Sequence, residues 1–132
     1  KLNLPVEKVN YFFGDQQERS RARRVLQERG DVIVSSSLDN NLEINAPGAT
    51  KGEAILRLAG HLGLCREQTM GFGDGENDMT MIRTAGIGVA MGNAVEALKA
   101  EADYVTVTND EDGVADAIEK LVLNVEMESR HN

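Results

Sequence analysis

Apolar and polar residues follow one rhythm in the first third of the chain and another in the rest. Three short runs rich in β-branched and aromatic residues predict strands, at 9–13, 32–36 and 42–45. A polar stretch with a narrow apolar stripe predicts a helix at 15–29, which Asp15 can cap and Gly30 can end. The arginines of this helix are expected on a solvated face. The order strand, helix, strand, strand is typical of a small α+β lobe.

After Pro47 and Gly48 the pattern changes to helices that alternate with short apolar strands. The helices are predicted at 51–62, 78–85, 94–100 and 112–123. The strands are predicted at 69–73, 87–91 and 104–108. Such alternation indicates an α/β fold with a parallel, doubly wound sheet, and ligands of these sheets bind at the carboxyl ends of the strands.

Charge divides the chain in the same place. The net charge of the 132 residues is −8; residues 1–50 carry seven acids and seven bases, and the remainder carries fifteen acids and seven bases. This balance argues against nucleic acid as a partner, since a phosphate backbone requires a cationic surface. The single cysteine, Cys65, fits a reducing, cytoplasmic setting, and no apolar run approaches the roughly 18–20 residues that span a bilayer.

The strongest chemical signal is the loop Gly-Asp-Gly-Glu-Asn-Asp at 73–78, which lies between a predicted strand and a predicted helix. Carboxylate and carboxamide oxygens on a tight loop suit Mg²⁺, and two glycines allow the backbone to bend sharply. The following helix offers free N–H groups to an anion. The competing interpretation is a turn in which Asn77 or Asp78 caps that helix.

Lys51 is the second candidate residue, because it stands where the helix dipole favours anions. A lysine that neutralises a phosphate would explain this position. The alternative is a solvent-exposed lysine that follows Thr50, the helix cap.

Taken in order, the segment 48–52, the loop at 73–78 and the segment 85–94 (AGIGVAMGNA) resemble the haloacid dehalogenase superfamily, and more closely its Cof-type sugar-phosphate phosphatases. The resemblance extends from about Val6 to Leu123. It implies that residues 47–123 are the C-terminal half of the catalytic core, a Rossmann-like parallel sheet with helices on both faces. Residues 1–46 would be the C-terminal part of the α+β cap domain, which selects the substrate, and 124–132 a polar tail.

The resemblance also assigns roles to four residues. Lys51 would stabilise charge on the nucleophile and the phosphoryl group, and Asn77 would help to hold the phosphate. Asp74 would bind Mg²⁺, the expected cofactor. Asp78 would be the second acid at the metal and would orient Lys51 or a metal-bound water. The implied substrate is a small phosphorylated metabolite such as a sugar phosphate, with no membrane partner.

The family's nucleophile is missing from the matching positions. It is the first Asp of an Asp-x-Asp pair on a strand that precedes the cap, and this chain begins inside the cap. The chain is therefore expected to be a fragment that is inactive alone. Asp110 and Asp112 have the Asp-x-Asp spacing and could serve a circularly permuted enzyme. The favoured interpretation is an ordinary strand-to-helix turn in which Asp112 caps the last helix.

Two other functions remain open. One is a non-catalytic half-domain that binds metal or a partner chain, either the missing N-terminal part or a second copy, through unpaired strand edges. The other is part of the phosphorylation domain of a cation-pumping ATPase, which shares the loop at 73–78. The segment around Lys51 and the polar tail fit a phosphatase better.

Overall fold

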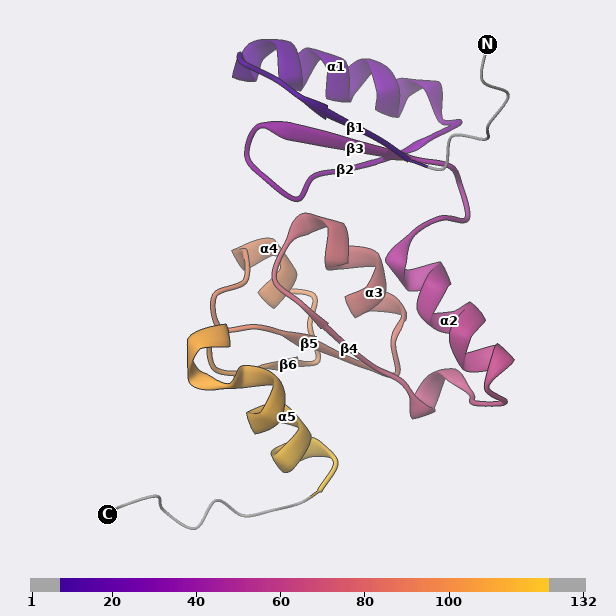
Figure 1. Cartoon of the computed structure of the whole chain (residues 1–132), viewed down its shortest axis with the longest axis vertical. Coiled ribbons are helices and arrows are strands. Elements are labelled where there is room, and N and C mark those ends of the chain that lie inside the picture. The colour runs from indigo at the N-terminus through magenta and orange to yellow at the C-terminus, as the bar shows by residue number, and fades with distance from the viewer. Residues whose placement is uncertain (1–7, 124–132) are drawn as a thin grey trace.

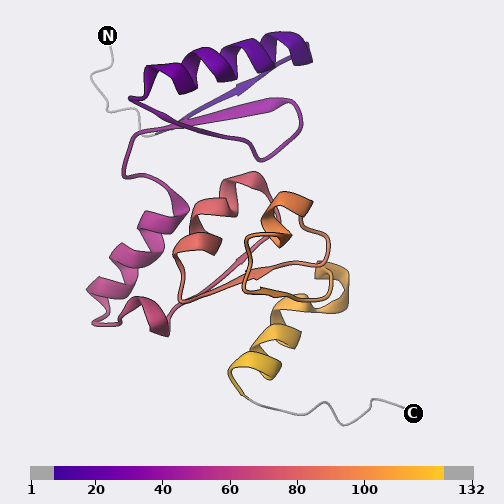
Figure 2. The same ribbon diagram turned by 180° about the vertical axis from the view of Figure 1, so that it is seen from behind.

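The structure, a computed structural model, describes residues 8–123, which form two lobes (Figure 1). The predicted polar tail at 124–132 lies outside these residues. The reverse view shows the same stacking of a first lobe above a second (Figure 2). Within residues 8–123 no helix is both long and apolar enough to cross a membrane.

The first lobe has the predicted strand–helix–strand–strand order. Its elements are β1 (Lys8–Phe12), α1 (Gln16–Arg29), β2 (Ile33–Ser35) and β3 (Asn41–Asn45). The sheet is antiparallel with β3 in the centre, in the order β1-β3-β2. As the sequence predicts, α1 begins where the Asp15 carboxylate accepts a hydrogen bond from the Gln17 N–H, and it ends at Gly30, whose φ is 73°. Helix α1 covers the face of the sheet that points away from the second lobe (Figure 1).

Strand β3 has one apolar and one polar face. Leu42 is completely buried, and Ile44 shares its face because alternate residues of a strand point to the same side. The polar residues Asn41, Glu43 and Asn45 share the other face. Glu43 and Asn45 line a pocket toward the second lobe. The sheet therefore packs its apolar face under α1 and turns a polar face toward the second lobe.

The second lobe confirms the predicted α/β class. Its elements are α2 (Lys51–His61), β4 (Met70–Gly73), α3 (Met79–Thr84), β5 (Ile87–Ala90), α4 (Glu96–Lys99), β6 (Tyr104–Val105) and α5 (Gly113–Leu121). Short 3₁₀ turns occur at η1 (Arg66–Gln68), η2 (Glu76–Asp78) and η3 (Asn109–Glu111). The sheet is parallel, in the order β4-β5-β6. Helices α3 and α4 lie on one side of it and α5 on the other (Figures 1 and 2).

The core of this lobe is aliphatic and lies between the sheet and α3 and α4. Its buried members are Ile82, Ala90, Met91, Ala94 and Leu98. Because β4 and β5 are held against this core, the loop that follows β4 starts from a fixed backbone.

The predicted cap of the last helix is wrong in its chemistry. Asp112 does precede α5, but its side chain makes no capping hydrogen bond. Its backbone is left-handed, with φ 58°, which is uncommon for a residue other than glycine. The preceding 3₁₀ turn η3 does have such a bond at its start, where the Glu111 carboxylate accepts from the Thr108 N–H and hydroxyl.

The last predicted strand is also shorter than the sequence suggests. Residues 104–108 were expected to be extended, and β6 spans only Tyr104–Val105. The Thr106 N–H still donates to the Ala90 carbonyl, and the Val107 carbonyl accepts from Gly92 N–H. The segment therefore stays beside β5 without regular strand geometry.

Candidate functional site

The loop at 73–78 is organised around the Asp78 carboxylate. Asp78 is only 5% exposed. Its Oδ2 accepts hydrogen bonds from the backbone N–H groups of Asp74, at 3.1 Å, and Gly75, at 3.2 Å. Asp78 stands at the N-cap position of α3, as the competing interpretation has it, but its side chain makes no capping hydrogen bond to that helix. The carboxylate instead folds the loop back on itself.

The two glycines of the loop provide space rather than an unusual backbone. Neither has a positive φ. A Cβ on Gly73 would lie 2.5 Å from the Asp78 Cβ, and one on Gly75 would lie 3.1 Å from Asn77 Oδ1. The sequence suggested that the glycines allow a sharp backbone bend. In the structure they instead leave room for the Asp78 and Asn77 side chains to approach the backbone closely.

Lys51 is the first residue of α2 and reaches this loop. Its Nζ donates a charged hydrogen bond to Asp78 Oδ1. Thr50 also caps α2, because its Oγ1 accepts from the Glu53 N–H and the Glu53 carboxylate accepts from the Thr50 N–H. The alternative is therefore confirmed: Thr50 caps α2 and the Lys51 side chain is 49% exposed, although its Nζ is paired with Asp78.

Gly52 brings α2 close enough for this contact. A Cβ on Gly52 would lie 2.5 Å from the Thr80 carbonyl oxygen and 2.7 Å from Thr84 Oγ1. The Gly52 N–H donates to Thr80 Oγ1 at 3.2 Å. The two adjacent residues therefore act together: Gly52 allows α2 to pack closely against α3, and Lys51 then reaches Asp78.

The Asp78 carboxylate is held in its charged form. Burial favours the neutral acid, but hydrogen bonds from Lys51 and from the N–H groups of Asp74 and Gly75 outweigh it. The pKa of Asp78 consequently lies below its ordinary value of 3.8. At neutral pH the site therefore contains a fixed Lys⁺–Asp⁻ pair.

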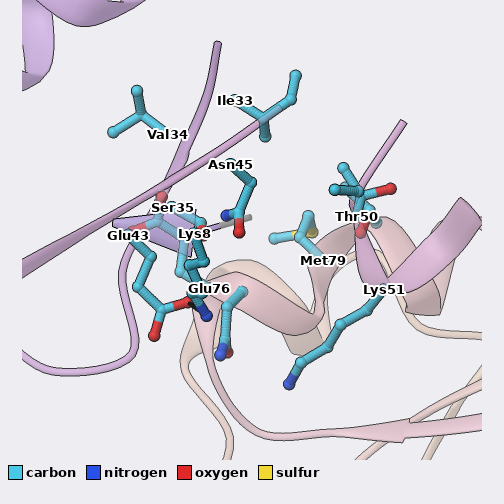
Figure 3. A pocket seen from close by; sticks show the side chains of 13 residues that line it. Lys8, Ile33, Val34, Ser35, Glu43, Asn45, Thr50, Lys51, Glu76 and Met79 are labelled. Carbon is cyan, nitrogen blue, oxygen red and sulfur yellow. Dashed lines mark ion pairs between the residues drawn. The ribbon is translucent and has the colours of Figure 1, made fainter. Parts of the chain in front are cut away.

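A pocket of about 320 Å³ separates Lys51 and the loop from the polar face of the first sheet. Lys51 and Asn77 line it from the second lobe. Lys8 and Glu43 line it from strands β1 and β3 (Figure 3). Of the four residues expected at the site, Lys51 and Asn77 thus meet in one pocket. Asp78 is paired with Lys51 beside it.

Glu43 is a residue that the sequence reasoning missed. It is 6% exposed in the central strand, where it forms an ion pair with Lys8 at 2.6 Å and accepts from Ser37 Oγ at 2.7 Å. Burial opposes its ionisation, but these two partners and the charge of Lys51 keep its pKa below the ordinary 4.5. The signal that could have found it is the strict polar–apolar alternation of Asn-Leu-Glu-Ile-Asn at 41–45.

The two lobes are also joined by an ion pair between Arg23 of α1 and Glu76 of the loop. The solvated face expected for the arginines is therefore wrong for Arg23, whose side chain is 25% exposed. Glu76 lines the same pocket as Lys51. The first lobe is in this way tied directly to the loop at 73–78.

Asp74, like Asp78, does not line this pocket. It is exposed at the end of β4, and in the part of the chain that the structure describes its carboxylate has no hydrogen-bond or ion-pair partner. Both oxygens of Asp78, by contrast, are occupied by donors. Among residues 8–123 no three Asp, Glu, His or Cys side chains are grouped to hold a metal. Any metal here would need ligands beyond those that this part of the chain supplies.

Asp112, the alternative nucleophile, lies elsewhere. It lines a different pocket, beside Met91 and Asn109. Neither Lys51 nor Asn77 belongs to that pocket. The structure therefore does not bring the Asp-x-Asp spacing of 110–112 to the candidate site.

Comparison with known proteins confirms the resemblance found in the sequence. A family model described as haloacid dehalogenase-like hydrolase matches residues 1–118. The chain is 40% identical over 116 residues to the 5-amino-6-(5-phospho-D-ribitylamino)uracil phosphatase YcsE of Bacillus subtilis (strain 168), a match that covers 88% of this chain and 47% of that protein. The chain spans less than half the length of the curated relatives that it matches first, for example 47% of YcsE and 38% of the phosphatase YwpJ of the same organism.

Solved structures agree with this assignment. A haloacid dehalogenase-like hydrolase from B. subtilis superposes with a TM-score of 0.84 at 36% identity, over 92% of this chain and 43% of that one. A subclass IIB sugar phosphatase of the same superfamily has a TM-score of 0.79 at 38% identity, over 89% of this chain and 44% of that one. The predicted α/β fold of this superfamily is thereby confirmed.

Replacing Gly52 by Ala tests whether close approach of α2 to α3 positions Lys51. The Cβ would press on the Thr80 carbonyl, so we expect Gly52→Ala to lower the free energy of unfolding by about 1–3 kcal/mol. Gly60 is the matched control in the same helix, with no atom within 4 Å of its would-be Cβ. Gly60→Ala should raise stability by roughly 0.5–1 kcal/mol through helix propensity. Equal effects in denaturant titrations would contradict this account.

The Asp78 carboxylate should also make stability depend on pH. Because folding lowers its pKa, its contribution is fully present above the unfolded value near 3.8 and is lost as pH falls through the folded value. At pH 7 we expect Asp78→Asn to cost about 1–3 kcal/mol. Urea unfolding between pH 2 and 7 should show the difference between wild type and variant shrinking in acid. Parallel curves over that range would show that Asp78 is not held in its charged form.

Proposed function

The chain belongs to the haloacid dehalogenase-like hydrolases, and on this premise we propose that it is the phosphate- and metal-binding part of a Mg²⁺-dependent, Cof-type phosphatase. Its substrates would be small phosphorylated metabolites such as sugar phosphates, which water cleaves to an alcohol and inorganic phosphate. The observation that carries the proposal is the meeting of Lys51 and Asn77 in one pocket beneath a polar sheet.

Lys51, Asn77 and Asp78 then have distinct proposed roles. Lys51 places a positive charge at the pocket and would neutralise a bound phosphoryl group. Asp78 holds the Lys51 ammonium in place, since its own buried charge is fixed by two backbone N–H groups. The Asn77 carboxamide, half-buried in the pocket lining, would donate a hydrogen bond to a phosphate oxygen.

Asp74 is the residue that fits a Mg²⁺ ligand best. Its carboxylate is exposed at the carboxyl end of a parallel strand, where hard oxygen ligands and several waters suit this ion. Asp78 would act on the metal through a water, because both of its oxygens already accept hydrogen bonds. A bound Mg²⁺ would supply charge neutralisation for the phosphoryl oxygens.

The nucleophile is proposed to lie outside this chain. The spacing Asp-x-Asp occurs only at 110–112, away from the pocket. We therefore propose that 1–46 belong to the cap and 47–123 to the catalytic core of a longer cytoplasmic enzyme. The chain alone would bind phosphate but not turn over substrate.

A non-catalytic, self-associating half-domain is the second candidate. Strand β4 is an edge of the parallel sheet, so one side of it has no strand partner within residues 8–123. Such an edge favours pairing with another segment, either from the rest of the enzyme or from a second copy. The Lys51–Asp78 pair and the pocket favour the phosphatase, because self-association requires neither.

Binding of inorganic phosphate in the presence of Mg²⁺ tests the proposal on this chain directly. We expect saturable binding by calorimetry, weakened about tenfold or more by Lys51→Ala because a charged hydrogen bond is lost. Asp74→Asn should weaken the Mg²⁺ dependence. Lys120→Ala is the matched control, since Lys120 also pairs with an aspartate and its side chain is 41% exposed against 49% for Lys51.

Turnover provides the second half of the same test. With Mg²⁺ and a generic phosphate ester, the chain alone should release no phosphate. Phosphate release that is abolished by Asp74→Asn would contradict the placement of the nucleophile outside this chain. Phosphate binding that is equal in the Lys51 and Lys120 variants would contradict the proposed site itself.

A further inference from the structure

The start of α2 is held at two points by the segment that begins α3. Lys51 gives its ammonium to the Asp78 carboxylate. The next residue, Gly52, donates its backbone N–H to Thr80 Oγ1 at 3.2 Å. In the part of the chain that the structure describes, no other hydrogen bond joins α2 to α3 or to the loop before it. One bond therefore holds the head of the lysine, and the other holds the backbone beside it.

The Gly52 N–H needs an acceptor from outside its own helix. It is one of the first-turn N–H groups for which an α-helix has no internal partner. The Thr50 hydroxyl accepts from the Glu53 N–H instead. Gly52 is buried, so water has little access to it, and a buried N–H without a partner is costly. The Thr80 hydroxyl supplies the missing acceptor, and it does so from a different helix.

This bond fixes the point from which Lys51 reaches the pocket. The bonds between Thr50 and Glu53 lie within α2 and its cap, so they would persist if the helix moved as a whole. The Thr80 bond instead ties the helix to α3. Figure 3 shows the Lys51 side chain stretched away from the start of α2, so it has little spare length to compensate for a displaced backbone. A fixed backbone matters most when a phosphate shares the ammonium with Asp78.

We propose that Thr80 is a positioning residue of the phosphate site: its hydroxyl holds the start of α2 on α3, so that Lys51 Nζ stays in the pocket. The inference rests on the proposed function, since it takes Lys51 to bind the phosphate. Thr80 lines the same pocket, but its role requires no contact with the ligand. It acts through the backbone of Gly52 and so through Lys51.

Thr84 provides a matched comparison on the same helix. Its Oγ1 would lie 2.7 Å from a Cβ on Gly52, so it packs against the same residue. Among residues 8–123, however, no N–H of α2 donates to it. Both threonines are half-buried, and valine keeps the branched shape of either side chain while removing its hydroxyl. Valine at each position therefore separates the hydrogen bond from packing alone.

A double-mutant cycle with inorganic phosphate tests the proposal. In calorimetry with Mg²⁺ present, Thr80→Val should weaken phosphate binding about three- to tenfold, the scale of one lost hydrogen bond. Thr80→Ser keeps the hydroxyl and should bind phosphate as the wild type does, and so should Thr84→Val. In a Lys51→Ala background Thr80→Val should cause no further loss, because the residue through which it acts is gone.

Three results would overturn the positioning role and leave the phosphate site standing. They are an equal loss from Thr80→Val with and without Lys51, no loss at all, and an equal loss in Thr84→Val. If Thr80→Val does not fold, amide hydrogen exchange of the wild type decides. The Gly52 N–H should then exchange about tenfold or more below the rate of a free amide, and exchange at the free rate would overturn the role. Failure of the wild type to bind phosphate would overturn the proposed function as well.

Discussion

The geometry of the site depends on one buried carboxylate. Asp78 receives the Lys51 ammonium on one oxygen and the N–H groups of Asp74 and Gly75 on the other. These contacts join the start of α2 to the loop after β4, two segments far apart in the sequence. Because the low exposure of Asp78 strengthens each hydrogen bond and penalises its loss, the pair is a rigid base for the rest of the site. Asn77 is positioned by the same loop.

Close packing of backbone against side chain makes this contact possible. Gly52 lets α2 rest on α3, and Gly73 leaves room for the Asp78 side chain. Neither glycine has a positive φ, so their value lies in the missing Cβ. Close packing against Gly73 and Gly75 thus positions the Asp78 and Asn77 side chains. The ion pair between Arg23 and Glu76 connects the first lobe to this loop. Residues of both lobes therefore line the pocket between them.

Local patterns in the sequence predicted most of the elements and the α/β class, because strand periodicity, helix caps and turn chemistry are local properties. The roles of Lys51, Asp74, Asn77 and Asp78 came from the family resemblance and stay predictions. The local patterns did not predict features that depend on contacts between residues far apart in the sequence. The polar face that Glu43 occupies is visible in the alternation of β3, but only the facing lobe shows that it lines a pocket. Asp112 occupies the N-cap position of α5 as predicted, yet its backbone is left-handed and its side chain makes no capping bond.

The central claim is that Lys51 and the loop at 73–78 form the phosphate-binding half of a phosphatase site. Its most direct test is a crystal structure of this chain grown with magnesium and phosphate. The account predicts phosphate density in the pocket, in hydrogen-bond contact with Lys51 Nζ and the Asn77 carboxamide, and Mg²⁺ at Asp74. Phosphate bound only elsewhere at saturating concentration, with the Lys51–Asp78 pair intact and the pocket filled by water, would contradict it.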